Sequence, residues 1–240
     1  MGVQEQERGD GTLPAVAGWY GKVPFLGDFA GRRLPSSFVR TWDDWLQSVI
    51  YGSRALMGED WLPSYLNSPV WHFCLAPGLC GNNAWVGLLM SSVDRANRHF
   101  PFTIAHGVTP EGLHDLAFGT LAEWLVSLES EAVTMLDLDG SVQTLEERLE
   151  ALASPLMLDD TRPRPQDDLA PYLGQLQLRR AEEVPSLMST LAFEALRNPG
   201  RGPSSLWWTS ADSEGQSWIF GSRGLPVAGA DRLKVGAELA

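Results

Sequence analysis

Two segments of the chain are apolar at nearly every position, and they constrain the fold more than any other feature. These segments are Val70–Leu75 and Ala84–Met90. A strand with one face in water alternates between apolar and polar residues, whereas a strand without alternation is buried on both faces. A sheet that contains such strands needs helices on both sides. We therefore expect an α/β fold with three layers, an α/β/α sandwich.

Four further segments are expected to be strands, because they are short and rich in aromatic and β-branched residues. They are Ala17–Val23, Phe102–Val108, Leu206–Thr209 and Ser217–Phe220. The link Pro77–Asn83 is short enough for an antiparallel pair, and a seven-residue polar link joins the last two segments as a hairpin. The sequence thus predicts a mixed, largely antiparallel central sheet of about six strands.

Adjacent tryptophans stand out in this last hairpin. Trp207 and Trp208 are neighbours on one strand, so their side chains must point to opposite faces of the sheet. Burial of both is the simpler interpretation. If helices leave part of the sheet uncovered there, one indole is instead an exposed anchor of the kind found at binding hot spots.

Amphipathic spacing predicts four helices. They cover residues 36–58, 111–135, a segment that follows Ser141, and 184–198. The first carries Phe38, Trp42 and Trp45 on one stripe, and Gly58 is suited to end it. These helices supply the two outer layers that the sheet requires.

The length of 240 residues fits one large domain. Residues 1–16 are polar and are expected to form a disordered tail, so we assign 17–240 to a single globular domain. The stretch Asp159–Asp168 is rich in Asp, Arg and Pro and is expected to be an exposed loop. It is too short to define a domain boundary.

Charge and targeting signals narrow the class of partner. The formal net charge is −12, so the chain lacks the cationic field that attracts nucleic acid or anionic lipid surfaces. No signal peptide is recognisable, and no apolar run reaches the roughly 18 residues of a membrane span. We expect a cytoplasmic protein without direct membrane insertion.

Cys74 and Cys80 match no metal-binding spacing, and two reduced thiols are favoured over a disulfide.

The signatures of common enzymes are missing from the sequence. It has no nucleophile elbow, zinc-protease motif or phosphate-binding loop, and Gly18–Lys22 has too few spacer residues for the last. His72 and His106 fall within predicted strands and are expected to be core residues rather than ligands. We predict no enzyme, no cofactor and no metal.

The stretch Ser91–Pro101 places an acid and two arginines directly after a buried strand. Charges at the end of an apolar strand must be paired or solvated. Arg95 and Arg98 are three residues apart, and a guanidinium group there can bind a carboxylate such as Asp28. The candidate cluster is therefore Gly27, Asp28, Phe29, Ser92, Asp94, Arg95 and Arg98. The cluster is predicted to be a scaffold ion pair, a partner-binding site, or both.

Two alternative functions use the same stretch. Ser92, Asp94 and His99 are a nucleophile, an orienting acid and a base, which would suit a hydrolase or phosphatase. They lie within eight residues, however, and such groups normally come from separate segments. With Arg98, the loop would also suit a small-ligand sensor that uses it as an anion site.

Short motifs in two blocks give the chain a family resemblance. The first block contains Gly18–Pro24, Gly27–Phe29, Leu34–Pro35 with Trp42 and Trp45, Trp71–Phe73, Gly78–Gly81, Ser92–Arg95 and Arg98–Pro101. The second contains Ser205–Trp208 and Arg223–Pro226. In this order they resemble the type VI secretion accessory proteins of the TagF or ImpM family. The two blocks span nearly half of the residues, whereas Glu111–Arg201 matches only in its helical character.

The resemblance implies a function that no catalytic motif carries. Members of this family are implied to be cytoplasmic, post-translational negative regulators of type VI secretion. They are implied to capture a forkhead-associated-domain scaffold protein and so prevent assembly of the contractile apparatus. Some relatives carry a fused phosphatase domain, and we expect this chain to be the stand-alone form. The binding surface and the oligomeric state stay open.

Overall fold

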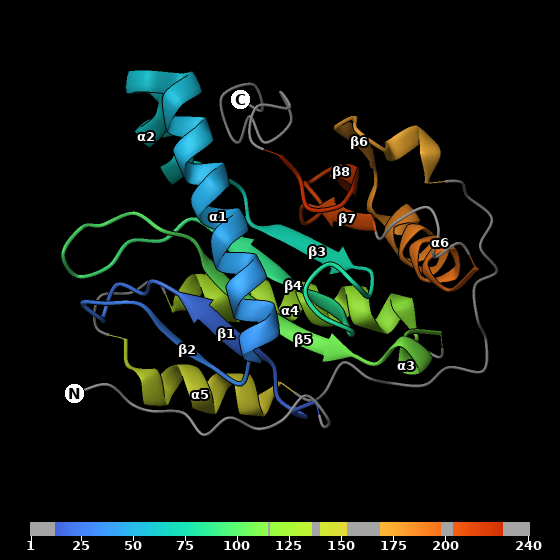
Figure 1. The fold of residues 1–240 in the computed structure, drawn as a ribbon, viewed down its shortest axis with the longest axis horizontal. Helices are drawn as coiled ribbons and strands as arrows, with labels where there is room; N and C mark the ends of the chain where they lie inside the picture. The colour runs from blue at the N-terminus through green and yellow to red at the C-terminus, as the bar shows by residue number, and fades with distance from the viewer. Residues whose placement is uncertain (1–12, 115, 136–139, 153–168, 198–203, 228–240) are drawn as a thin grey trace.

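An eight-stranded antiparallel sheet forms the centre of the structure (Figure 1). The computed structural model describes residues 13–114, 116–135, 140–152, 169–197 and 204–227. The strands are β1 (Gly18–Gly21), β2 (Ala30–Arg32), β3 (Trp71–Leu75), β4 (Ala84–Met90), β5 (Phe102–Val108), β6 (Gln177–Arg180), β7 (Ser204–Trp208) and β8 (Gln216–Arg223). Their order across the sheet is β2-β1-β5-β4-β3-β7-β8-β6.

The predicted α/β class is confirmed, but the predicted number of strands is too low. The two additional strands, β2 and β6, are the outermost strands of the sheet. Both are short, and three of their seven residues are arginines, so neither has an apolar pattern. Every pairing between the named strands is antiparallel in the described residues. A single parallel bridge joins Leu173 to Gly221.

Helices lie on both faces of this sheet (Figure 1). The α-helices are α1 (Ser36–Met57), α2 (Trp61–Leu66), α3 (Pro110–His114), α4 (Phe118–Thr134), α5 (Val142–Ala151) and α6 (Val184–Arg197). Short 3-10 turns are η1 (Gly58–Asp60), η2 (Ala170–Tyr172) and η3 (Ala181–Glu183). In the part of the chain covered by the structure, no helix combines the length and the apolarity needed to cross a bilayer.

The single helix predicted at 111–135 is two helices, so that prediction is wrong. Ala117, with ψ at 85°, lies outside the helical region and separates α3 from α4. The other helix ends agree closely with the sequence pattern. Gly58, with φ at 56°, follows α1, and the hydroxyl of Ser141 accepts a hydrogen bond from the backbone N–H of Thr144 at 3.1 Å.

Two hydrophobic cores lie on opposite faces of the sheet. One joins the sheet to α3, α4, α5 and α6, and the other joins it to α1. Trp208 belongs to the first core and Trp207 to the second, and both are buried. This confirms the prediction that the two indoles point to opposite faces. The absence of alternation in β3 and β4 thus follows from burial on both sides.

Aromatic side chains dominate the core beneath α1. The Trp42 ring lies parallel to that of Trp207, with centroids 6.1 Å apart, and 4.9 Å from the ring of Phe73. Its buried indole N–H donates to Thr103 Oγ1 at 2.9 Å. A fully buried indole with its donor satisfied contributes on the order of 3–5 kcal/mol. These contacts fix the first half of α1 on the sheet.

The structure tests the predictions for the N-terminal segment and for the two cysteines only in part. Residues 1–12 and the predicted loop at 159–168 lie outside the described residues. The sequence predicts a disordered tail up to residue 16, but Leu13 and Val16 are partly buried and pack against the two cores. Cys74 and Cys80 are buried free thiols.

Both strand histidines lie in the core, as predicted, but their surroundings differ. His72 Nε2 lies 2.7 Å from the Glu129 carboxylate of α4. His106 is 1% exposed, packs against Trp124, and finds no hydrogen-bond partner for either ring nitrogen among the described residues. Burial lowers the pKa of His106 from 6.5 to about 4. The folded chain therefore keeps this imidazole neutral.

The depressed pKa of His106 predicts a loss of stability in acid. Between pH 6.5 and pH 4 the unfolded chain binds a proton at this residue that the folded chain does not. Stability therefore falls as the pH drops through this window, by about 2–3 kcal/mol at pH 4.5. Urea unfolding at pH 7 and pH 4.5 measures the loss in the unaltered chain and in His106→Leu. The variant should lose correspondingly less, and an equal loss in both chains would contradict the assignment.

Candidate binding edge around Asp94

Two loops meet at one edge of the sheet. Residues 22–29 connect β1 to β2, and residues 91–101 connect β4 to β5. The loops start close together because β1 pairs with β5, with Gly21 opposite Phe102. Gly21 has φ at 131°, and a Cβ atom there would lie 2.1 Å from the Pro101 carbonyl oxygen. Only glycine permits this close approach, which brings Lys22 to the second loop.

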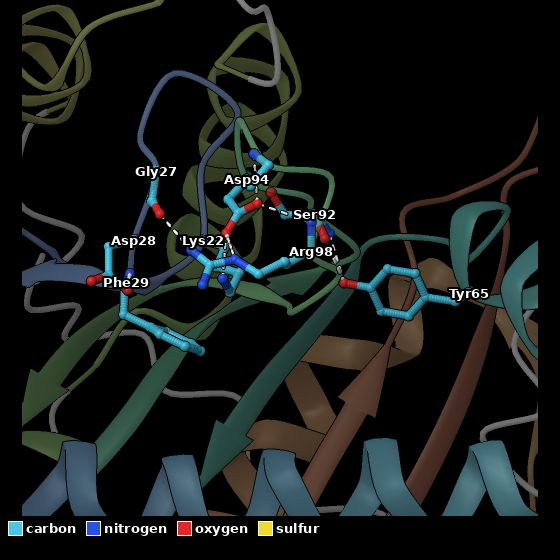
Figure 2. Close-up of polar contacts among 9 residues, drawn as sticks. Lys22, Gly27, Asp28, Phe29, Tyr65, Ser92, Asp94 and Arg98 are labelled. Carbon is cyan, nitrogen blue, oxygen red and sulfur yellow. Dashed lines mark hydrogen bonds and ion pairs between the residues drawn. The ribbon is translucent and has the colours of Figure 1, made fainter.

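Asp94 is the centre of this edge, and its side chain has no exposed surface. Its Oδ1 accepts hydrogen bonds from the backbone N–H groups of Ala96 and Arg98, both at 2.9 Å. Its Oδ2 accepts from the Lys22 ammonium and, at 2.7 Å, from Arg98 Nε. Asn97 adopts φ of 60°, a left-handed conformation that asparagine tolerates in tight turns. We call Lys22, Asp94 and Arg98 the Asp94 cluster (Figure 2).

The charges of the cluster compensate one another. Burial alone would raise the pKa of Asp94, but the hydrogen bonds from Lys22, Arg98 and Ala96 lower that pKa well below its ordinary value. The carboxylate is therefore ionised throughout the range in which proteins are stable. The Lys22 side chain is only 4% exposed, and the Asp94 carboxylate is the ion-pair partner of its ammonium group. Removing one member of such a pair leaves an uncompensated buried charge.

The two arginines join the loops through backbone carbonyls. Arg98 donates to the carbonyl oxygen of Gly27, and the Arg95 side chain donates to that of Phe25 at 2.7 Å. The backbone N–H of Arg95 donates to the carbonyl oxygen of Leu26 at 2.9 Å. Together these bonds hold residues 25–27 against the second loop. The predicted proximity of the loops is thus found.

The predicted partner of the arginines is wrong. Asp28 forms no ion pair in the described structure, and its Oδ1 accepts the backbone N–H of Phe29 at 2.8 Å. Arg98 pairs with Asp94, four residues earlier in the same loop. The local turn already places that carboxylate within reach, whereas Asp28 lies on the other loop and faces solvent.

The seven candidate residues divide into an interior and a rim. Ser92 and Asp94 are buried, whereas the other five, Gly27, Asp28, Phe29, Arg95 and Arg98, are exposed. Phe29 is 45% exposed, although its ring lies 4.7 Å from that of Phe100 and under the Lys22 ammonium. The interior is therefore a scaffold. A partner would contact the rim, which includes the ring of Phe29 (Figure 2).

Helix α2 is attached to the same edge. The Tyr65 hydroxyl donates to the Ser92 carbonyl oxygen at 2.8 Å and accepts the Ser92 backbone N–H at 2.9 Å (Figure 2). The His99 ring meets the rings of Trp61 and Tyr65 edge-on. No hydrogen bond among the described residues joins His99 to Asp94 or Ser92. The geometry of a nucleophile, base and acid in contact is therefore not formed by these three residues in the described structure.

Sequence reasoning missed Lys22 and Tyr65 as members of this edge. A signal for Lys22 was present, because a lysine at the end of an apolar strand next to Val23 and Pro24 needs a buried carboxylate partner. Tyr65 gave no comparable signal, since its partner is backbone. No group of three or more His, Cys, Asp or Glu side chains in the described residues is arranged to hold a metal ion.

The fold and the edge define a mixed α/β domain whose loops are fixed by buried charges, and comparison identifies its family. The family described as TagF N-terminal domain, type VI secretion system-associated, matches residues 18–152. This range is more than half of the chain, so the chain belongs to the TagF family, and the predicted resemblance is confirmed.

A solved structure extends the likeness to nearly the whole chain. The crystal structure of PA0076 from Pseudomonas aeruginosa PAO1 is 28% identical in sequence, with a TM-score of 0.66. The match covers 92% of this chain and 94% of PA0076. No curated protein matches the chain in sequence.

Substitutions that remove one or both charges of the Lys22–Asp94 pair should differ in their effect on the free energy of unfolding. Asp94→Asn keeps an acceptor for the turn but leaves Lys22 as a buried unpaired charge, so we expect a loss of about 3 kcal/mol. The double variant Lys22→Met/Asp94→Asn should recover at least about 1 kcal/mol of that loss. Asp28→Ala, at the exposed rim, should stay within about 0.5 kcal/mol of the unaltered chain.

Urea unfolding at pH 7 gives all three values. Equal destabilisation by Asp94→Asn and Asp28→Ala would contradict the scaffold role of the buried pair.

Proposed function

We propose that this chain is a cytoplasmic, post-translational negative regulator of bacterial type VI secretion. It binds a forkhead-associated-domain scaffold protein and withholds it from assembly of the secretion apparatus. The observation that carries the proposal is membership of the TagF family across residues 18–152. Regulation of this kind requires a stable binding surface and no reactive group.

The construction of the Asp94 edge supports a binding role. Its interior fixes two loops through bonds to side chains and carbonyls, so their order does not have to be gained on association. Its rim exposes Phe29, Arg95 and Arg98. Aromatic residues and arginine are the types enriched at the energetic centres of protein interfaces.

We propose that the chain is non-catalytic. The strongest catalytic alternative needed His99 as a base for Ser92, with Asp94 as its orienting acid. His99 instead packs against Trp61 and Tyr65, and the Asp94 carboxylate is occupied by two cations and two backbone N–H groups. These contacts support a structural use of the residues.

Deletion of the gene tests the regulatory role directly. In the source bacterium we expect secreted type VI proteins to rise severalfold in the medium, while the messenger levels of the secretion genes stay constant. Mass spectrometry of the medium and RNA sequencing measure the two quantities. Plasmid-borne expression of the unaltered chain should restore the original level. Equal secretion with and without the gene would refute the repressor role.

An activity assay addresses the hydrolase alternative. We expect the purified chain and its His99→Ala variant to show no turnover of generic phosphate and carboxylic ester substrates. Turnover by the unaltered chain that disappears in the variant would instead establish an enzyme. Because His99 packs on α2, the melting temperature of the variant must be measured alongside, so that unfolding is not mistaken for lost activity.

A further inference from the structure

A helical arm extends from the sheet beside the Asp94 edge. Helix α1 has 22 residues, but its last buried residue is Leu46. From residue 47 to residue 57 it continues for about 16 Å, and α2 follows at its far end (Figure 1). We define residues 47–66 as the arm. Its part of α1 has no buried residue. Ile50 packs against the core beneath α1, but core packing does not explain the exposed Tyr51 and Leu56.

The arm concentrates exposed hydrophobic side chains. Ten large hydrophobic residues are exposed in the described part of the chain, and four of them lie here. They are Tyr51 at 79% exposure, Leu56 at 70%, Leu66 at 53% and Leu62 at 40%. Isolated exposed hydrophobic residues are normal, whereas a group on one short segment is typical of an interaction site.

Contacts within the arm hold it in one conformation. The Trp61 indole N–H donates to Ser53 Oγ at 2.9 Å, and the Arg54 guanidinium lies 4.0 Å from the centre of a Trp61 ring. Tyr65 stacks on Trp61 and bonds to the backbone of Ser92. The exposed side chains are thus presented on an ordered support, which lowers the entropic cost of binding.

The positions of these side chains indicate a concave partner. Tyr51 and Leu56 are five residues apart on α1, which separates them by about 140° around the helix axis. A flat surface cannot cover both, but a groove can enclose them, as in other complexes where a helix lies in an apolar groove.

The charge at the tip indicates a basic partner. Glu59 and Asp60 are exposed between the two helices, and the chain as a whole carries a net charge of −12. A second copy of the chain would bring the same acidic side chains to the contact, and like charges disfavour such pairing. A groove bordered by lysine or arginine would complement the tip.

We propose that the arm inserts into an apolar groove, bordered by basic side chains, on the forkhead-associated-domain scaffold. This inference rests on the proposed function, which supplies the partner. The Asp94 edge then acts as the base of the arm, because Tyr65 fixes α2 to Ser92. The arm provides the apolar contact.

Matched double variants test the proposal. Leu56→Gln/Leu66→Gln removes apolar surface from the arm, and Val126→Gln/Val133→Gln removes similarly exposed residues from α4 on the other side of the sheet. Isothermal titration with the purified scaffold should give a Kd at least tenfold weaker for the arm variant and unchanged for the α4 variant. Circular dichroism should show unchanged melting temperatures, because all four residues are exposed. A third variant, Glu59→Gln/Asp60→Asn, should weaken binding severalfold at low salt.

The outcomes separate the two proposals. If the unaltered chain does not bind the scaffold, both proposals are overturned. If it binds and the arm variant binds equally well, only the docking site is overturned. Light scattering after gel filtration tests the alternative that a second copy of the chain binds the arm. If the unaltered chain is a dimer and the arm variant is a monomer, the arm mediates self-association and the proposal is overturned.

Discussion

The buried Asp94 carboxylate is the interaction on which the candidate edge depends. It compensates the charge of Lys22 at the end of β1 and closes a turn by accepting backbone N–H groups. Through Arg98 the same turn reaches the loop that contains Gly27. Ser92, two residues earlier, anchors α2. Loss of the carboxylate would therefore weaken two loops and a helix at once, although the two hydrophobic cores would remain.

Features that depend on residue type and local spacing could be predicted from the sequence. Burial on both faces follows from the unbroken apolar runs in β3 and β4, and the opposed burial of Trp207 and Trp208 follows from strand geometry. The edge strands β2 and β6 could not be predicted in this way. Each has one neighbour and faces solvent at most positions, so its residues carry little hydrophobic pattern.

The candidate site was predictable in its loops but not in its pairings. Family motifs identified both loops, and the structure brings them together. The ion pair of Lys22 and Asp94 spans 72 residues, and no local pattern indicates such a distant contact. Asp28 was the obvious carboxylate on the opposite loop, yet Asp94 was already within reach of Arg98 in its own turn. Choosing between two carboxylates required the backbone geometry.

The fold itself limits where a partner can bind. Helices lie on both faces of the sheet, and most residues of the named strands are buried in the described part of the chain. Edge pairing is also disfavoured, because β2 and β6 are three and four residues long and carry arginines, and charged short strands resist the addition of another strand. At the β2 edge, Arg33 is further engaged by Glu146 of α5. The loop edge around Asp94 and the arm beside it differ from these strands, because their exposed aromatic, apolar and charged groups lie on an ordered support.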